Sequence, residues 1–319
     1  MAFSARTWGA LAVVGVVVAF SLSSTLVKRA NSPGVLLAFW RLATVSVVWN
    51  LYLRCTGRRV TMRHVRQALI PGVFFGLNLA IFFAGATHNS VANAALIGSL
   101  SPFLIVPIGA WLFSEYFDMR ALGFALVSFA GVVIVLFSAP PRGDASMKGN
   151  VFGFTAMVLL VCYVSSTRYF RRDMDVATFM ATISPIAAVA VLPLAIANGG
   201  VFGMSSAGWT YMLILALLIG VAGHGLMVFA QQTIAIGTIG VSSVIQPALA
   251  VVWSFLLLSE AVRGWQLVGI TVAIVGLGAF LVFNERGERS RRAEEQSQPP
   301  LIGADPDATG PAPGVRPVV

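Results

Sequence analysis

The sequence predicts an all-α integral membrane protein with ten transmembrane helices, arranged as two inverted five-helix repeats. Hydrophobic residues make up 57% of the 319 residues and charged residues only 10%, whereas a soluble domain carries about 25% charged residues. Ten apolar runs are each about 18 residues or longer, which is enough to cross a bilayer. One stretch of the chain also occurs twice at a fixed offset, which indicates a duplication.

The ten spans are read from these apolar runs in order. The first run is followed by Lys28 and Arg29 rather than by the small residues of a cleavage site, so we interpret it as a retained helix and not as a signal peptide. The first five spans make a predicted repeat over residues 1–140, and the last five make a second repeat over 149–284. We place the spans at residues 8–27, 35–53, 68–87, 91–113, 121–138, 150–167, 177–197, 209–230, 236–258 and 265–283.

The duplication is clearest in the fourth and ninth spans. The segment SLSPFLIVPIGAWLFSE ends at Glu115, and the matching VIQPALAVVWSFLLLSE ends at Glu260, 145 positions later. The Ser-Ser-Thr segments 23–25 and 165–167 also match, 142 positions apart. Because five is an odd number, the second five-helix unit enters the membrane from the opposite side. Inverted repeats of this kind are the architecture of many secondary transporters.

The basic residues predict the orientation. With the N-terminus in the cytoplasm, the inner segments hold 15 Lys and Arg residues and the outer segments hold 5. Because inner loops carry an excess of Lys and Arg, we predict a multi-pass protein of the cytoplasmic (inner) membrane with both termini in the cytoplasm. The basic residues are spread over short loops, so the net charge of +9 is interpreted as a topology signal and not as a nucleic-acid site.

Residues 285–319 differ in composition from the rest of the chain. This segment is rich in Glu, Arg, Gln, Pro and Gly and lacks apolar periodicity. Such a composition buries too little apolar surface to fold, so the segment is predicted to be a disordered cytoplasmic tail.

Two prolines occupy matching positions in the duplicated spans. A proline inside a helix removes a hydrogen bond, so Pro102 should free the carbonyl of Gly98, and Pro247 should free that of Ser243. An unpaired carbonyl in hydrocarbon costs several kcal/mol and is tolerated where a neighbour, water or a substrate satisfies it. Matched breaks therefore predict helix-break or gating positions beside a central binding site. A simple packing kink is the alternative.

Polar side chains near these breaks are the candidate substrate-binding residues. A polar stripe on a membrane helix faces the bundle interior or a watery cavity, although serine and threonine hydroxyls also join helices by hydrogen bonds. Two tryptophans are added as possible aromatic walls. The candidates are Ser24, Trp40, Asn78, Asn93, Ser166, His224, Ser243, Gln246 and Trp253.

The charged and titratable residues of the spans leave alternatives open. Arg41 could hold a substrate carboxylate or phosphate, it could extend to the interface, or it could tie helix ends together. His224 could carry a coupling proton or be a hydrogen-bonded structural histidine. Glu115 and Glu260 end their helices, where a structural role is favoured.

Several classes of active site have no support in the sequence. No Asp or Glu lies inside a predicted span away from its ends, and the chain lacks a GK[ST] phosphate loop and an HExxH motif. Cys55 and Cys162 have no CxxC partner or metal-like spacing. The prediction is a protein that is not an enzyme and uses no metal or cofactor.

At this point the pattern resembles the EamA-type drug/metabolite transporter superfamily. The resemblance covers residues 8–283 and is carried by LLAFWRLATVSVVW, by FFAGATHNSVANAALIGSLSPFLIVPIGAWLFSE and by VFAQQTIAIGTIGVSSVIQPALAVVWSFLLLSE. It implies a central cavity walled by helices 1, 3, 4, 6, 8 and 9 that opens alternately to each side. It also implies export of amino acids, metabolites or toxic compounds, as in many bacterial members, or uptake, as in others.

The sequence therefore predicts a secondary transporter that moves small metabolites, such as amino acids or related polar or amphipathic compounds, across the cytoplasmic membrane by alternating access, with export expected. The alternatives are an uptake permease of the same fold, or a membrane-embedded enzyme or receptor. The predicted partners are a small-molecule substrate and the lipid bilayer. Gly72 and Gly76 permit close helix contact within one bundle or at a dimer seam, so a monomer and a homodimer both stay open.

Overall fold

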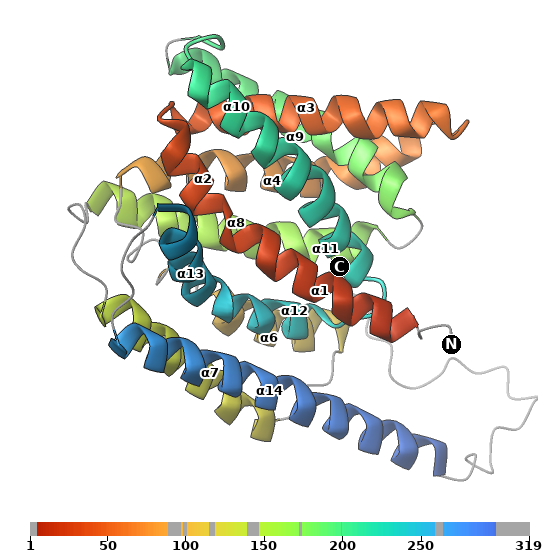
Figure 1. Cartoon of the computed structure of the whole chain (residues 1–319). Coiled ribbons are helices and arrows are strands. Elements are labelled where there is room, and N and C mark those ends of the chain that lie inside the picture. The colour runs from red at the N-terminus through yellow and green to blue at the C-terminus, as the bar shows by residue number, and fades with distance from the viewer. Residues whose placement is uncertain are drawn as a thin grey trace, which may run out of the picture.

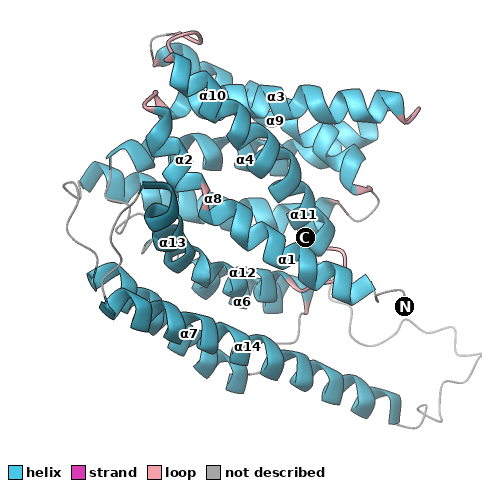
Figure 2. Cartoon of the chain, in the orientation of Figure 1, coloured by secondary structure: helices cyan, strands magenta, loops and turns pink. Residues whose placement is uncertain are grey.

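The computed structural model describes residues 5–88, 97, 101–114, 119–138, 147–171, 174–198, 200–258 and 264–297. Within these ranges every regular element is a helix (Figure 2). Seven of the helical segments are long and apolar enough to cross a membrane. The predicted all-α membrane class is thereby confirmed. The predicted span 91–113 lies partly outside the described ranges, and two further apolar helices, Arg120–Ile134 and Ile236–Ala250, are shorter.

The first half of the chain forms six described helices. The predicted span 8–27 is divided at Leu22 into two helices, which together make one candidate span from Thr7 to Ala30. The predicted spans 35–53, 68–87 and 121–138 agree with helices except at the ends, and of the span 91–113 only residue 97 and residues 101–113 are described. The helices are α1 (Ala5–Ser21), α2 (Ser23–Ala30), α3 (Gly34–Cys55), α4 (Met62–His88), α6 (Ser101–Phe113) and α7 (Met119–Ser138).

In the second half, two predicted spans are interrupted. A π-helix replaces α-helix in the middle of the span predicted at 209–230, and a 3₁₀ turn divides the span predicted at 236–258. The elements are α8 (Met147–Phe170), α9 (Val176–Ala197), α10 (Ser206–Ile214), η1 (Leu215–Gly223, π), α11 (His224–Ala230), α12 (Ile236–Ser242), η2 (Ser243–Ile245, 3₁₀), α13 (Gln246–Leu258) and α14 (Gly264–Ser297).

The start of α9 is fixed by its capping residue. The Asp175 carboxylate accepts a hydrogen bond from the backbone N–H of Thr178, as expected of an N-cap. The same carboxylate forms a 2.5 Å ion pair with Arg58, in the loop that follows α3. The cap therefore also joins the ends of α3 and α9, which pack against each other through the membrane (Figure 1).

The π-helix η1 contains two glycines at close contacts. A Cβ atom at Gly220 would overlap the side chain of Val45 and lie 3.4 Å from Nε of Arg41, both on α3. A Cβ atom at Gly223 would lie 3.0 Å from the ring of Phe20 on α1. The small residues let η1 approach both helices, and π segments inside α-helices are frequent at functional sites.

Helices α7 and α14 pack together along one side of the molecule (Figure 1). The Ser128 hydroxyl on α7 donates a 2.8 Å hydrogen bond to the carbonyl of Ala273 on α14. Gly131 lies against the backbone of Ala273, and Gly276 lies against the backbone of Ser128. Residue numbers rise along α7 as they fall along α14 at these contacts, so the two helices are antiparallel. Residues 128 and 273 are separated by the 145-residue offset of the duplication, and so are residues 131 and 276.

The largest cluster of buried apolar side chains joins α3, α4, α8, α9 and η1. A second cluster joins α1 and α13 with α7 and α14. Elements from both halves of the chain contribute to each cluster, so neither half packs as a separate body.

Helix α14 continues past the end of the predicted span into the segment predicted to be disordered. The span predicted to end at 283 belongs to a helix that runs to Ser297, and residues 298–319 lie outside the described ranges. Because the membrane helix already supplies the nucleus, the extension avoids the cost of starting a new helix.

Candidate functional site

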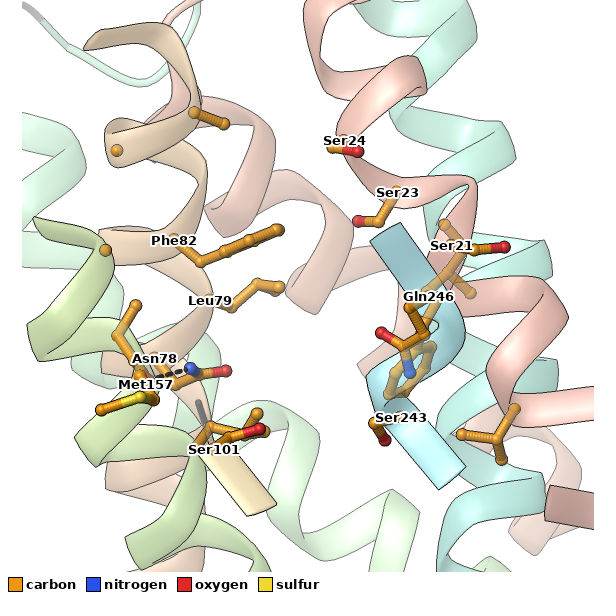
Figure 3. A pocket seen from close by; sticks show the side chains of 18 of the residues that line it. Ser21, Ser23, Ser24, Asn78, Leu79, Phe82, Ser101, Met157, Ser243 and Gln246 are labelled. Carbon is orange, nitrogen blue, oxygen red and sulfur yellow. Dashed lines mark hydrogen bonds between the residues drawn. The ribbon is translucent and has the colours of Figure 1, made fainter. Parts of the chain in front are cut away.

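A cavity of about 210 Å³ lies between the two halves of the chain. Its lining comes from α1, α2, α3, α4 and α6 in the first half and from α8, η1, α11, α12, η2 and α13 in the second half. In Figure 3, Asn78, Leu79, Phe82 and Met157 lie on one side of the cavity, and the serines of α1 and α2 lie opposite with Ser243 and Gln246.

The broken helix α12–η2–α13 places two polar residues on the cavity. Ser243 begins the 3₁₀ turn and Gln246 begins α13, and both line the cavity (Figure 3). The carbonyl that Pro247 was expected to free is not left unpaired, because the Gln246 backbone N–H donates to the carbonyl of Ser243. The Ser243 hydroxyl donates to the carbonyl of Ile239. The backbone break is thus satisfied locally, and the Gln246 side chain is the polar group that it delivers to the cavity.

Helix α6 carries the equivalent proline near its described beginning. Ser101 is the first residue of α6 and lines the cavity, and Pro102 is the second. Gly98, whose carbonyl Pro102 was expected to free, lies outside the described residues.

Asn78 on α4 faces the cavity with one end and binds α8 with the other. Its Nδ2 atom donates a 2.7 Å hydrogen bond to the carbonyl of Ala156. This bond fixes the amide plane, and the side-chain oxygen points toward the cavity (Figure 3). Asn78 can therefore join α4 to α8 and accept a hydrogen bond from a ligand at the same time.

The α1–α2 junction lines the opposite wall with serines. Ser21, Ser23 and Ser24 surround the break at Leu22 and all line the cavity. The Ser21 hydroxyl donates to the carbonyl of Val18 and accepts a 2.7 Å hydrogen bond from Nε1 of Trp253. Trp253 thus supports a cavity residue without being one of the residues that line the cavity.

Two further candidates lie away from the cavity. Trp40 donates a 2.6 Å hydrogen bond from Nε1 to the carbonyl of Val201, and its ring packs edge-on against Trp209. The Ser166 hydroxyl donates to the carbonyl of Cys162 within its own helix. Of the nine candidates, Asn93 lies outside the described residues, and the five that line the cavity are Ser24, Asn78, His224, Ser243 and Gln246.

His224 and Arg41 are buried polar residues on the cavity wall. His224 is 5% exposed, and its ring lies 4.7 Å from the ring of Phe20 and 4.6 Å from that of Phe75. Its Nδ1 atom has no hydrogen-bond partner within the described part of the chain. Arg41 is 1% exposed and reaches the cavity from α3. The sequence could have marked Arg41 as a cavity residue, because it is the only Lys or Arg inside a predicted span.

The cavity reaches one end of the bundle and stops short of the other. Its lining includes Lys28, Ala86 and Gly149, which lie within three residues of the ends of α2, α4 and α8. Toward the opposite end, the last lining residue of α8 is Val164, although α8 continues for six more residues to Phe170.

The end that the cavity does not reach is closed by one contact between the halves and by contacts within the second half. A Cβ atom at Gly9 on α1 would overlap the Thr233 side chain in the turn after α11. The Arg168 guanidinium donates to the carbonyl of Gln231. Arg171, which follows α8, is buried, and this burial lowers the pKa of its guanidinium from the ordinary value. The closure therefore consists of close packing and buried polar groups.

Comparisons with known proteins agree with this arrangement. Residues 7–137 and 147–282 each match the sequence model of the EamA-like transporter family. The chain is 26% identical over 119 residues to the pseudopaline exporter CntI of Pseudomonas aeruginosa, a match that covers 37% of this chain and 42% of the exporter. It is 22% identical over 269 residues to the uncharacterized transporter YetK of Bacillus subtilis, covering 81% of each chain.

A solved crystal structure is also similar to this chain. It is 19% identical in sequence, with a TM-score of 0.71 over 89% of this chain and 99% of the other. At this level of identity the likeness concerns the fold alone.

Proposed function

This chain belongs to the EamA-like transporter family, and from that premise we propose that it is a secondary transporter that exports small polar or amphipathic metabolites, such as amino acids or related compounds, by alternating access. The resemblance predicted from the sequence motifs is confirmed by the family match. The chain is a multi-pass membrane protein and a transporter rather than an enzyme, with a small-molecule substrate and a lipid environment. Export as the direction is supported by the partial match to an exporter.

The proposed architecture is ten membrane helices in two inverted repeats, residues 1–140 and 149–284. Two matches to one family model support the duplication. The α7–α14 contact supports the inversion, because Gly131 meets the backbone of Ala273 while its counterpart Gly276 meets the backbone of Ser128. Equivalent positions that exchange contacts across an antiparallel pair are what a two-fold axis in the membrane plane produces.

The observation that carries the transport proposal is one cavity, lined by both halves, that reaches one end of the bundle and is closed at the other. Alternating access needs a central site of this kind between two units that can rock against each other. With the N-terminus in the cytoplasm, as the distribution of Lys and Arg favours, Lys28 lies at the outer end and Gly9 at the closed inner end. The described conformation is then outward-facing.

We assign substrate binding to the five candidates that line the cavity, and we assign a change of helix geometry during transport to the segments around Pro102 and Pro247. The assignment is supported by the polar groups that face the cavity, above all the amide of Gln246 and the side-chain oxygen of Asn78 (Figure 3). The rest of the wall is largely apolar, which suits an amphipathic solute.

The proposal is tested by counterflow in liposomes that contain the purified protein. Liposomes preloaded with a panel of unlabelled amino acids should accumulate the matching labelled amino acid, and empty liposomes should not. Gln246→Ala and His224→Ala should slow exchange while the amount of folded protein stays near that of the wild type. Exchange at the wild-type rate in both variants would contradict the site, and no exchange of any amino acid in the wild type would contradict the substrate class.

A further inference from the structure

The guanidinium of Arg41 is buried beside the cavity. The residue is 1% exposed, and neither Nε nor Nη2 has a hydrogen-bond partner among the described residues. Its Cζ atom lies 5.5 Å from the centroid of the Phe83 ring. The free energy of a cation–π contact offsets only part of the free energy that an arginine loses when it leaves water. A buried guanidinium therefore calls for a hydrogen-bonded anion.

The described part of the cavity wall supplies no such anion. None of the described residues that line the cavity is Asp or Glu, whereas Arg41 lines it. Asp175 is occupied by Arg58 in the loop after α3. No carboxylate of the described lining faces the Arg41 guanidinium, which favours a negatively charged occupant.

The remaining lining limits the size and character of that occupant. A volume of about 210 Å³ admits a small molecule. Phe20, Leu79, Phe82 and Met157 give the wall large apolar surfaces. The space suits a small molecule with one anionic group and one apolar part.

We propose that Arg41 anchors the carboxylate of a small amphipathic organic acid, whose apolar part lies against the Phe82 and Met157 wall. A guanidinium donates charge-assisted hydrogen bonds to a carboxylate, and these are about twice as strong as bonds between neutral groups. A single carboxylate is favoured over a phosphate because Arg41 is the one arginine among the described residues that line the cavity. The proposal rests on the transport function proposed above and names the chemical class of its substrate.

A purely structural arginine makes a different prediction. If Arg41 only ties α3 to its neighbours, its replacement should weaken the binding of acids and of uncharged analogues alike, because the fold would change for both. If Arg41 binds a carboxylate, its replacement should weaken the acid selectively. Selectivity between an acid and its amide is therefore the measurement that separates the two roles.

The test uses three acids with different apolar parts: butanoate, 3-phenylpropanoate and indole-3-acetate. Each is titrated against its primary amide by calorimetry with the purified full-length protein, and phenyl phosphate is included as a phosphate probe. At least one acid should bind the wild type about 10- to 100-fold more tightly than its amide, the range expected for a charge-assisted hydrogen bond. Arg41→Gln should abolish this ratio, and Arg41→Lys should keep part of it.

The control is Arg54→Gln, which removes an exposed arginine from the other end of the same helix. It should leave the acid-to-amide ratio unchanged. A ratio near one for all three pairs in the wild type would overturn the proposal even if Arg41→Gln failed to fold. An undiminished ratio in folded Arg41→Gln, or tighter binding of phenyl phosphate than of any acid, would overturn it as well.

Counterflow separates this inference from the proposed function. If the acids bind selectively but no solute exchanges across the liposome membrane, the transport function fails and the anion site stands. If acids and amides exchange equally well in both the wild type and Arg41→Gln, the carboxylate anchor fails and the transport function stands.

Discussion

The contact between α7 and α14 allows a quantitative prediction about the scaffold. A Cβ atom at Gly131 would lie 2.7 Å from the carbonyl oxygen of Gly269 and 2.9 Å from Cα of Ala273. A Cβ atom at Gly276 would lie 2.5 Å from the backbone nitrogen of Ser128 and 2.9 Å from its Cα. Carbon atoms normally pack at about 3.5–4.0 Å. Since these are all backbone atoms, no change of side-chain rotamer relieves the overlap, and the helices must separate.

Gly131→Ala and Gly276→Ala should each destabilise the fold. Overpacking costs about 1–3 kcal/mol, and replacing glycine by alanine in a helix returns up to about 1 kcal/mol. The matched controls are Gly123→Ala on α7 and Gly278→Ala on α14, where a Cβ atom meets nothing within 4 Å. The control variants should gain only the stability that comes from the higher helix propensity of alanine. The free energies of unfolding of the contact and control variants should therefore differ by about 1–3 kcal/mol.

The measurement is the free energy of unfolding in mixed micelles. The double variant with Gly131→Ala and Gly276→Ala should lose less free energy of unfolding than the two single variants together, because one separation of the helices accommodates both methyl groups. Contact variants as stable as their controls would refute the close packing. Neither glycine lines the cavity, so counterflow per folded molecule should stay at the wild-type rate.

The remaining predictions concern the cavity and its closed end. Gln246→Ala should reduce ligand affinity, while Gln232→Ala, at an exposed position, should not; equal effects in calorimetry would contradict the assignment. Trp253→Phe removes the donor to Ser21 and should cost about 1 kcal/mol of unfolding free energy; unchanged stability would count against that bond. Gly9→Ala should push the closed end apart. It should therefore slow counterflow and speed amide hydrogen exchange in the turn after α11. Amide hydrogen exchange at the wild-type rate in that turn would show that this contact does not close the cavity.

The positions of many helices could be predicted from the sequence because hydrocarbon requires long apolar runs. The span predicted at 35–53 is α3, Gly34–Cys55, and the span predicted at 177–197 is α9, Val176–Ala197. Loop signals such as Asp175, which caps α9, coincide with the ends of these runs. Composition and length carry this information directly.

The breaks inside helices were only partly predictable. Pro247 marked the region of the 3₁₀ turn, because proline cannot donate the hydrogen bond that would continue the helix. The break at Leu22 and the π-helix η1 contain no proline. Their geometry accompanies close contacts with other helices, such as that of Gly220 with Val45, and contacts between distant segments cannot be read from local sequence.

The candidate site shows a similar division. Asn78 and Gln246 were predicted as cavity residues because an amide inside an apolar run needs a polar environment, and both line the cavity. Trp40 and Ser166 satisfy their polar atoms with the carbonyls of Val201 and Cys162 instead. Whether a polar side chain faces the cavity or a neighbouring carbonyl depends on the rotation of its helix within the bundle, which local composition does not determine.

The scaffold and the site differ in their symmetry. At the α7–α14 contact, positions that match in the duplication make equivalent contacts, because a glycine of each helix lies against the backbone of the other. Arg41 has no such counterpart. The position 142 residues later is Ile183, a fully buried apolar residue on α9. A solute with one anionic end and one apolar end has no two-fold symmetry, so two equivalent arginines would leave one guanidinium buried and unpaired. One arginine in the proposed inverted-repeat frame would therefore fix both the charge and the orientation of the proposed ligand.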